Sequence, residues 1–324
     1  MLTQTITYDQ AFLEQFEEGL DPLDPEHSRI PARVLGYGEM STVMTISGAD
    51  PGLVFKRMPM FQSESELEPY LALYDGYLEH MIAAGIVMVP AAITSVTSSS
   101  GDVVAYIIQE KLDSRTLVNK AIHTCSDVEV ERLFAAIVDS LGQVFAYNSA
   151  HKRAVEIGID AQMSNWAIIN YDVESGTIPD PVELIYIDTS SPLLRLNGEE
   201  QLDPELFMRS APSFLRWVLR LLYLEDMLNR YYDRRQVTID IVANLYKEKR
   251  TEVIPTLLAQ ANEFLVKNSD GEPMEPITER EVAGYYKEDA RIWTVYLGFR
   301  RIDRWIHRAL GKPYPYVLPG RVER

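Results

Sequence analysis

The sequence contains a single cysteine, Cys125, among 324 residues. An intramolecular disulfide and a cysteine-based zinc site are therefore both excluded. Basic residues are also scarce, because 31 lysines and arginines face 48 aspartates and glutamates, which gives a net charge of −17. This balance argues against binding to nucleic acid, which needs a basic surface to displace counterions. A cationic or neutral partner fits it, although a solvated acidic surface would look the same and is the favoured interpretation.

The chain also lacks a long apolar segment. Its most apolar stretch, residues 216–228, is interrupted by Arg216, Arg220 and Glu225, which is typical of a buried amphipathic helix. No uninterrupted run reaches the roughly 18 residues that cross a membrane. The N-terminal residues show no basic segment followed by an apolar core, so no signal peptide is predicted. We therefore expect a cytoplasmic protein that works without a membrane.

The length of 324 residues suggests roughly two domains. Apolar residues make up 46% and charged residues 24% of the chain, which is the balance of an ordinary globular protein. We expect an N-terminal helix and connector over residues 1–30, a β-rich unit over 31–112 and a mainly helical unit over 113–324. The β-rich unit is predicted to hold short strands and one helix, so the fold class that follows is α+β.

The spacing of apolar residues places the helices. A helix over residues 66–84 is indicated by apolar side chains that recur near every fourth position, namely Leu67, Leu71, Tyr74, Leu78 and Ile82. A longer helix is predicted over 127–154, capped by Ser126 or Asp127. Three more helical stretches and an extended tail are expected at 204–232, 237–267, 279–310 and 312–320, with Pro255 marking a break in the second stretch.

Two glycines lie between the first predicted strands. Gly36 and Gly38, in "LGYGEMSTV", are followed by Ser41 and Val43. Glycine lets backbone amides approach an anionic ligand closely, so a phosphate-binding loop is one interpretation. An ordinary hairpin turn is the more frequent meaning of two glycines between strands.

A lysine follows in a predicted strand. Lys56 comes after two apolar residues, and a strand lysine is usually an exposed edge charge. The next helix, however, carries Glu66 and Glu68 near its start, and one of them could hold the ammonium group toward a phosphate. Glu68 is the preferred partner because it follows the core-facing Leu67.

Asp160 and Asn165 lie five positions apart in a predicted strand–turn–strand hairpin over residues 157–169. A carboxylate there can accept the proton of a substrate hydroxyl, and the amide oxygen can bind Mg²⁺. Downstream, Asp188 ends an apolar strand in "ELIYIDTSSP", where a carboxylate suits the Mg²⁺ ion that bridges phosphates. A helix cap or a turn explains Asp188 equally well when it is taken alone.

The order of these motifs resembles the protein-kinase-like superfamily. The matching stretches are "GYGEMSTV" for the glycine-rich loop, "VFK" for the strand lysine, "DAQMSN" for the catalytic loop and "IDT" for the magnesium aspartate. The layout is similar to the small-molecule branch, which includes aminoglycoside, choline and homoserine kinases. The resemblance implies a two-lobed fold, with a small antiparallel-sheet lobe that holds one helix and a larger, mainly helical lobe. ATP and Mg²⁺ are the implied cofactors.

The same resemblance implies a role for each matching residue. Lys56 would hold the α- and β-phosphates, and Asp160 would be the catalytic base. Asn165 and Asp188 would hold Mg²⁺, and the backbone of residues 106–113 would meet adenine, unless that segment is a plain edge strand. The implied nucleotide site comprises Gly36, Gly38, Ser41, Val43, Lys56, Glu68, Glu110 and Leu112.

Three features depart from the kinase pattern. Ser41 replaces the third glycine of the loop, Gly158 stands where a histidine usually precedes the catalytic aspartate, and Asp188 is followed by Thr-Ser-Ser-Pro instead of Phe-Gly. These departures keep three functions open. The preferred one is phosphotransfer to a small hydroxylated or amino-bearing molecule. The others are a scaffold that binds nucleotide without transfer, and transfer of AMP onto a protein.

The acceptor is expected to bind among the helices of residues 204–310. An acidic lining there would suit a cationic acceptor, and the candidate residues are Glu225, Asp226 and Asp289. Solvated helix faces would explain all three equally well. The sequence leaves the oligomeric state open.

Overall fold

The N-terminal part of the protein is built on a five-stranded antiparallel sheet. The computed structural model describes residues 6–38, 40–98, 101–152, 154–209, 228–268 and 274–320. The strands lie in the order β1-β2-β3-β5-β4, which places β3 in the middle of the sheet. Their bounds are Ala32–Tyr37 (β1), Thr42–Ile46 (β2), Leu53–Phe61 (β3), Ala91–Thr97 (β4) and Val103–Glu110 (β5).

Strand β5, which lies between β3 and β4, is buried on both faces because helices cover the sheet from two sides. Its odd-numbered residues, from Val103 to Ile107, belong to the main core together with residues of α2 (Glu64–Ala83). Its even-numbered residues, from Val104 to Ile108, pack in a second cluster with Leu13 and Phe16 of α1 (Gln10–Glu18). This two-sided burial explains why the strand is a nearly continuous apolar run.

Helix α2 presents tyrosines to the core. Its buried residues are Leu67, Tyr70, Tyr74, Tyr77 and Met81. The apolar stripe expected from the sequence was partly wrong, because Ile82 is 60% exposed. The buried face follows the helical repeat through three tyrosines, whose polar ends need partners inside the protein.

The C-terminal part is mainly helical. Helix α4 (Asp127–Ala150) begins with a capping box formed by Ser126 and Glu129, which confirms the expected N-cap. The helical stretch predicted over 237–267, with a break at Pro255, is confirmed as two helices, because a turn separates α8 (Arg234–Lys247) from α9 (Ile254–Lys267). Pro255 lies in the first turn of α9, where proline needs no amide hydrogen bond.

Shorter elements complete the two parts. They are the helices α3 (Val118–Ala121) and α5 (Pro204–Arg209), and one-turn 3-10 helices at Pro25–His27, Ser114–Thr116, Met163–Asn165, Arg230–Tyr232 and Thr251–Val253. Of the helix expected over 204–232, the structure describes α5 and residues 228–229 as α-helix, and residues 210–227 lie outside the described ranges. The α+β class is confirmed, with a small antiparallel-sheet lobe and a larger, mainly helical lobe.

The hairpin predicted over residues 157–169 is wrong. Strand β6 (Val155–Ile157) pairs with β9 (Leu194–Leu196), whereas β7 (Trp166–Ile168) pairs with β8 (Leu184–Tyr186). A further short strand, β10 (Glu199–Glu200), joins β9. Each strand finds its partner downstream, so the intervening residues form an open loop with a 3-10 turn instead of a tight hairpin turn.

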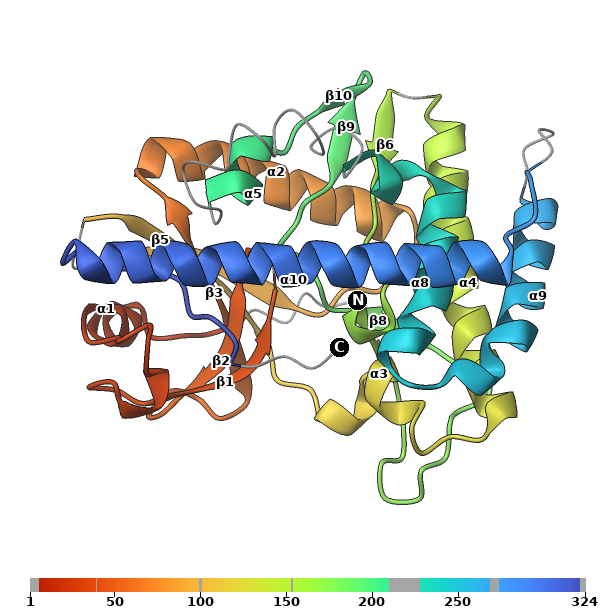
Figure 1. Ribbon diagram of the computed structural model, residues 1–324, viewed down its shortest axis with the longest axis horizontal. Coiled ribbons are helices and arrows are strands. Elements are labelled where there is room, and N and C mark those ends of the chain that lie inside the picture. Colours follow the sequence, from red (N-terminus) through yellow and green to blue (C-terminus); the bar gives the residue numbers. More distant parts are fainter. Residues whose placement is uncertain are drawn as a thin grey trace.

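A long helix links the ends of the molecule. Helix α10 (Glu279–Ala309) extends across the full width of the protein and packs on α8 and α9 (Figure 1). The tail that follows contains a small buried cluster of Tyr314, Tyr316 and Leu318. The Pro315 carbonyl oxygen accepts a hydrogen bond of 2.6 Å from Arg57 of β3. The C-terminal tail therefore packs on the sheet lobe.

Arg57 also forms a buried ion pair with Glu17 of α1. Its Nε lies 2.8 Å from Glu17 Oε2 and its Nη2 lies 2.5 Å from Oε1. The hydroxyl of Tyr106 donates to the same carboxylate. Both charged side chains are 3% exposed, so the pair fixes α1 against the face of β3 opposite Lys56.

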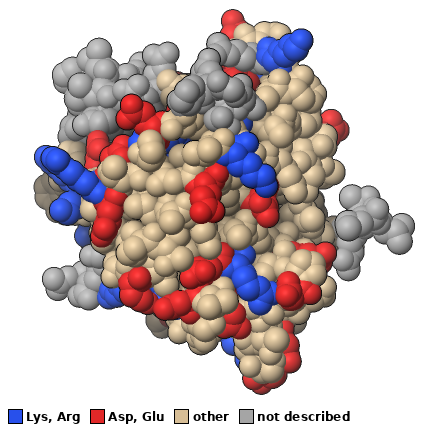
Figure 2. Space-filling view, turned by 90° about the vertical axis from the view of Figure 1, so that its right-hand side faces the viewer, with Lys and Arg blue, Asp and Glu red and all other residues tan. Residues whose placement is uncertain are grey.

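The surface offers no simple patch of one charge on the face shown in Figure 2. Acidic and basic side chains are interspersed there among large uncharged areas. Among the described helices, none combines the length and apolar character needed to cross a membrane.

Candidate active site

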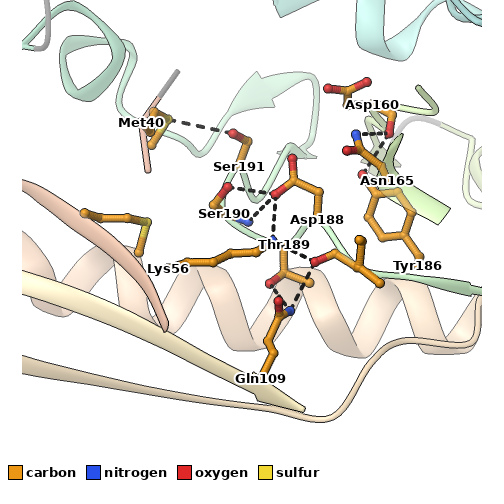
Figure 3. A network of polar contacts seen from close by, with 12 residues as sticks. Met40, Lys56, Gln109, Asp160, Asn165, Tyr186, Asp188, Thr189, Ser190 and Ser191 are labelled. Atoms are coloured by element: carbon orange, nitrogen blue, oxygen red, sulfur yellow. Dashed lines mark hydrogen bonds and ion pairs between the residues drawn. The ribbon is translucent and has the colours of Figure 1, made fainter. Parts of the chain in front are cut away.

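Lys56 lies on the middle strand of the sheet, and its ammonium group reaches the helical lobe. The side chain is buried and its residue pairs with Ile107 of β5. Nζ donates to the Ile187 carbonyl oxygen at 2.7 Å and to Asp188 Oδ1 at 3.2 Å (Figure 3). The lysine is therefore a buried cation between the lobes, and the edge-charge interpretation does not apply.

Asp188 follows β8 and is held by its own turn. Ser190 donates to Oδ1 from its backbone amide at 3.2 Å and from its hydroxyl at 2.8 Å. Burial alone would raise the pKa of Asp188, but Lys56 and the Ser190 hydrogen bonds lower it below the usual value. The carboxylate is thus negative at neutral pH. Within the described residues its hydrogen bonds all fall on Oδ1, which leaves Oδ2 for a further ligand.

Asp160 and Asn165 belong to one loop, and hydrogen bonds within the loop hold it together. Asn165 Nδ2 and the Tyr186 hydroxyl both donate to the Asp160 carbonyl oxygen at 3.0 Å. The backbone amide of Gln162 donates to Asp160 Oδ1 at 3.2 Å. The Ile187 amide donates to the Asn165 carbonyl oxygen at 2.9 Å, which joins this loop to the segment that Lys56 contacts. The structure therefore brings the predicted lysine, asparagine and both aspartates together.

The surroundings of Asp160 favour its protonated form. Burial is the main cause of a pKa raised above the usual value, and the negative charges of Asp240 and Asp188 add to it. A carboxyl group with a pKa near the working pH is suited to accept and return a proton. Asp160 therefore has the electrostatic setting of a general base.

Asp240 is a site residue that sequence analysis missed. It is buried on α8, where burial raises its pKa, Arg230 opposes that effect and Asp289 adds to it. Its signal was available in the sequence, since Asp240 is the sole charged residue between Val237 and Tyr246. A charge inside an apolar helical run marks a buried ionisable group, and such groups gather at functional sites.

The residues present fit a Mg²⁺ ion. Asp188 offers an ionised oxygen. Asn165 donates a hydrogen bond through Nδ2, and its side-chain oxygen accepts none from the described residues, so that oxygen can bind a metal ion. Within the same described ranges no three His, Cys, Asp or Glu side chains lie close enough to form a complete metal cage. That is the usual situation for Mg²⁺, which binds to one or two protein carboxylates together with phosphates and water.

The glycine segment packs beside this group of residues. The amide of Gly38 donates to the Ser41 carbonyl oxygen at 2.8 Å, which closes the turn between β1 and β2. Met40 is buried, and its sulfur accepts from the hydroxyl of Ser191 at 3.8 Å (Figure 3). A Cβ atom at Gly36 would meet nothing within 4 Å, so there is open space on that side. Ser41 is buried and Val43 is half-buried on β2; phosphate binding by this segment stays a prediction.

The predicted pairing of Lys56 with Glu68 is not found. Glu68 is exposed on α2, and the ammonium group contacts Asp188 instead. The alternative, Glu66, receives two hydrogen bonds from Arg209 of α5. The pairing fails because the first turn of α2 faces α5 and solvent, while the turns that face the site carry tyrosines.

Three tyrosines lie on the turns of α2 that face the site. The Tyr70 hydroxyl donates to the Ser190 carbonyl oxygen at 2.9 Å, and the Tyr74 hydroxyl lies 3.2 Å from Thr189 Oγ1. The Tyr77 hydroxyl donates to the Gly158 carbonyl oxygen at 3.2 Å. Helix α2 thus contacts both segments that carry the predicted aspartates, through hydroxyls at helical spacing. The sequence signal was this repeat of tyrosines, of which sequence analysis named only Tyr74, as part of the apolar face.

Gln109 is a second missed residue. It is buried near the end of β5, and Nε2 donates to the Ile187 carbonyl oxygen at 3.1 Å, the same oxygen that Lys56 contacts. Glu110 is exposed at the end of that strand and Leu112 is half-buried just beyond it. Their predicted contact with adenine stays a prediction.

Gly158 has a structural reason to replace the usual histidine. A Cβ atom there would lie 2.9 Å from the Cβ of Leu193 and 3.0 Å from the ring of Tyr232. The space beside this backbone is therefore filled by two other side chains. Only glycine fits without a shift of its neighbours.

A small pocket opens beside Asp240. It is lined by residues from the loop of Asp160 and Asn165, from α8 and from α10, namely Gln162, Asp240, Ala243, Asn244, Lys247, Tyr285, Tyr286 and Asp289. Asp289, one of the three acidic candidates for the acceptor site, is therefore at this pocket. Glu225 and Asp226 lie outside the described residues.

A larger cavity of about 780 Å³ lies between the end of α4 and the start of α8. Its lining mixes charges of both signs, for example Lys152, Glu156, Arg235 and Glu281. Lys56, Asp160, Asn165 and Asp188 do not line it, so size alone does not identify the active site here.

Comparison with known proteins gives a family and a distant structural likeness. The model of a family of unknown function (DUF6206) matches residues 26–304. No curated protein matches the sequence. A solved structure described as "WaaP in complex with acyl carrier protein" aligns with 80% of this chain and 98% of its own, at 12% identity and a TM-score of 0.30. So distant a likeness gives no information on activity.

Proposed function

We propose that this chain, which belongs to the DUF6206 family of unknown function, is an ATP- and Mg²⁺-dependent phosphotransferase that acts on a small molecule. The observation that supports the proposal best is the contact between Lys56 and Asp188 across the lobes, beside the loop of Asp160 and Asn165. A buried ammonium group, a carboxylate with a lowered pKa and an amide oxygen are the groups that a metal–triphosphate requires.

In this proposal the charge of each side chain determines whether it binds the metal ion or the phosphates. Asp188 and Asn165 would hold Mg²⁺, which neutralises the charge of the phosphates when it is bound. Lys56 would exchange its contact with Asp188 for the α- and β-phosphates. Gln109 would keep the Ile187 carbonyl oxygen paired while Lys56 moves, because both donate to that oxygen.

Asp160 would act on the acceptor. As the acceptor oxygen bonds to the γ-phosphorus and the bond to ADP breaks, the hydroxyl proton passes to the Asp160 carboxylate. The raised pKa of Asp160 makes the carboxylate a stronger base than an ordinary aspartate. Positioning and charge neutralisation supply the rest of the rate in phosphoryl transfer.

The test is a comparison of binding and turnover. Mg²⁺-ATP is expected to raise the melting temperature, since a ligand at 100 times its Kd stabilises the native state by about 2.7 kcal/mol. Slow ADP release is expected in the wild type and should fall by about 10²–10⁴-fold in Asp160→Asn. An absent melting shift, or ADP release that is equal in Asp160→Asn, would count against the proposal.

A nucleotide-binding scaffold is the second candidate, and one observation favours it. Gly158 takes the place of the histidine that usually precedes the catalytic aspartate of kinases, and Ser41 takes that of the third glycine of the loop. A scaffold would show the melting shift without ADP release. Intact mass after incubation with Mg²⁺-ATP distinguishes a third outcome, transfer of AMP onto protein, by a nucleotide-sized increment instead of a phosphate.

A further inference from the structure

Helix α10 exposes a stripe of large apolar side chains. Five of them, in the helix and at its C-terminal end, are between 42% and 69% exposed, namely Ile292, Val295, Ile302, Trp305 and Leu310. The helix crosses a broad face of the protein in front of the other elements (Figure 1), and its buried side carries Leu297 and Arg300. Surface helices normally present polar side chains to water, so this apolar stripe marks a surface that binds a partner.

The exposed charges beside the stripe all have one sign. Four charged residues between positions 291 and 312 are exposed, and all four are basic, namely Arg291, Arg301, Arg308 and Lys312. In this segment six lysines and arginines face a single acid, Asp303, whereas the whole chain has a net charge of −17. A basic segment on an otherwise acidic protein selects an anionic partner.

The width of the stripe favours a flat partner over a second helix. At about 100° per residue, Ile292 and Trp305 lie about 140° apart around the helix, and Val295 and Ile302 lie between them. A seam that receives one helix is narrower, because two rows of side chains form it. Trp305 is the most exposed of the five side chains, and tryptophan is enriched where lipid meets water. An apolar helix face with a tryptophan and basic neighbours is typical of a helix that lies on a membrane.

We infer that α10 binds along the surface of an anionic membrane, with the stripe among the lipid head groups and the basic side chains beside lipid phosphates. A helix in this position lies on the bilayer instead of crossing it. The inference goes beyond the proposed phosphotransfer and does not depend on it, since no residue of the stripe belongs to the candidate active site. It differs from the sequence-based expectation of a protein that works without a membrane, which considered only segments long enough to span one.

The test is co-sedimentation of the full chain with lipid vesicles. One set of vesicles contains phosphatidylcholine alone, and the other also contains about one third of the anionic lipid phosphatidylglycerol. Partition onto the anionic vesicles is expected to be at least about tenfold stronger at about 0.1 M salt, and to weaken as added salt screens the charges. Equal partition onto the two sets, or no partition onto either, would overturn the inference.

Variants locate the contact on α10. Trp305→Glu is expected to lower partition onto anionic vesicles by about tenfold or more, because it puts a negative charge into the stripe. Arg291→Gln combined with Arg308→Gln should lower partition onto anionic vesicles and leave that onto neutral vesicles unchanged. Urea denaturation is expected to give wild-type stability for these exposed positions.

The matched control is Val266→Glu. Val266 lies on α9 and is 68% exposed, so this variant adds the same charge at an equally exposed apolar residue outside the stripe. Its partition onto anionic vesicles should stay close to the wild-type value. If Trp305→Glu bound these vesicles as well as Val266→Glu does, α10 would not be the contact.

A protein partner on the stripe would give a different result. If the stripe pairs with a second copy, light scattering of the lipid-free chain shows a mass above the 36.9 kDa of one chain, and Trp305→Glu restores that value. This outcome without vesicle binding would overturn the inference in favour of a dimer. Trp305→Glu is expected to keep the melting shift with Mg²⁺-ATP. Vesicle binding and nucleotide binding can therefore fail separately.

Discussion

The ammonium nitrogen of Lys56 lies 3.2 Å from Oδ1 of Asp188, although the two residues are 132 positions apart in the sequence. One comes from the middle strand of the sheet and the other from the segment after β8. The pair is largely buried, with side chains 8% and 27% exposed, so it joins the lobes where solvent screens it little. Neither charge has a use in holding a simple core together, since apolar packing would serve as well.

The first prediction concerns Lys56. Lys56→Met keeps the length of the side chain but removes the charge that would hold the phosphates. We expect Mg²⁺-ATP binding to weaken by about tenfold or more and ADP release to be lost, as measured by titration calorimetry and by a coupled ADP assay.

The control for Lys56→Met is Glu68→Gln. Glu68 is exposed and makes no contact with Lys56, so both readouts should stay at wild-type values. A loss of nucleotide binding in Glu68→Gln equal to that in Lys56→Met would restore the pairing that the sequence suggested.

The second prediction is a pH dependence. Asp160 must be deprotonated to act as a base, and its pKa is raised by burial, then by Asp240 and Asp188. The rate is therefore expected to fall as the pH drops, and to do so at a higher pH than the ordinary aspartate pKa of about 3.9 would give. Asp240→Asn removes one of the charges that raise this pKa, so the acidic limb should move to lower pH.

The measurement is kcat/KM for ATP hydrolysis between pH 5 and 8 without an acceptor, and the shape of the profile is compared instead of its height. Glu288→Gln should leave the limb in place, because Glu288 is not among the groups that act on Asp160. A limb that stays in the same position in Asp240→Asn would show that the titrating group is not Asp160.

The sequence predicted that the lysine, the asparagine and the two aspartates lie near one another, because each lies within or beside an element with an apolar pattern. Lys56 sits in a strand with apolar neighbours, Asp188 comes two residues after the end of another, and Asp160 and Asn165 lie in the loop between β6 and β7. The order of elements along the chain therefore determined the lobe to which each residue belongs. This is local information that one chain can supply.

The partners of side chains and strands could not be predicted from the sequence in the same way. Glu68 was chosen from its place in the helix, but which side of α2 faces the site depends on tertiary packing against α5 and the sheet. Likewise β6 and β7 were expected to pair with each other, whereas their partners are β9 and β8. Strand pairing and side-chain partners are determined by contacts between distant segments. The spacing of apolar residues along the sequence does not reveal these contacts.

The third prediction tests why Gly158 is glycine. In Gly158→Ala the new methyl group would lie 2.9 Å from the Leu193 Cβ and 3.0 Å from the Tyr232 ring, so neighbours must shift. We expect the free energy of unfolding to fall by about 1–3 kcal/mol in urea denaturation.

Gly298→Ala is the matched control, since Gly298 lies inside α10 and a Cβ atom there meets nothing within 4 Å. Alanine is the better helix former, so this variant should be more stable by up to about 1 kcal/mol. If Gly158→Ala were as stable as wild type, the missing histidine would need an explanation other than packing.

The fourth prediction concerns the buried pair of Glu17 and Arg57. In Glu17→Ala the guanidinium keeps the Pro315 carbonyl oxygen as an acceptor but loses its buried counter-charge, so an uncompensated buried cation remains. We expect a loss of about 3–5 kcal/mol in the free energy of unfolding, measured by urea denaturation.

The control is Glu18→Ala, one residue along α1. It removes an exposed ion pair with Arg29 and should lower the free energy of unfolding by no more than about 1 kcal/mol. The pair anchors α1 and the C-terminal tail on the strand that carries Lys56, so Glu17→Ala should also weaken Mg²⁺-ATP binding. Equal free energies of unfolding in Glu17→Ala and Glu18→Ala would instead show that the tail is held by its tyrosines alone.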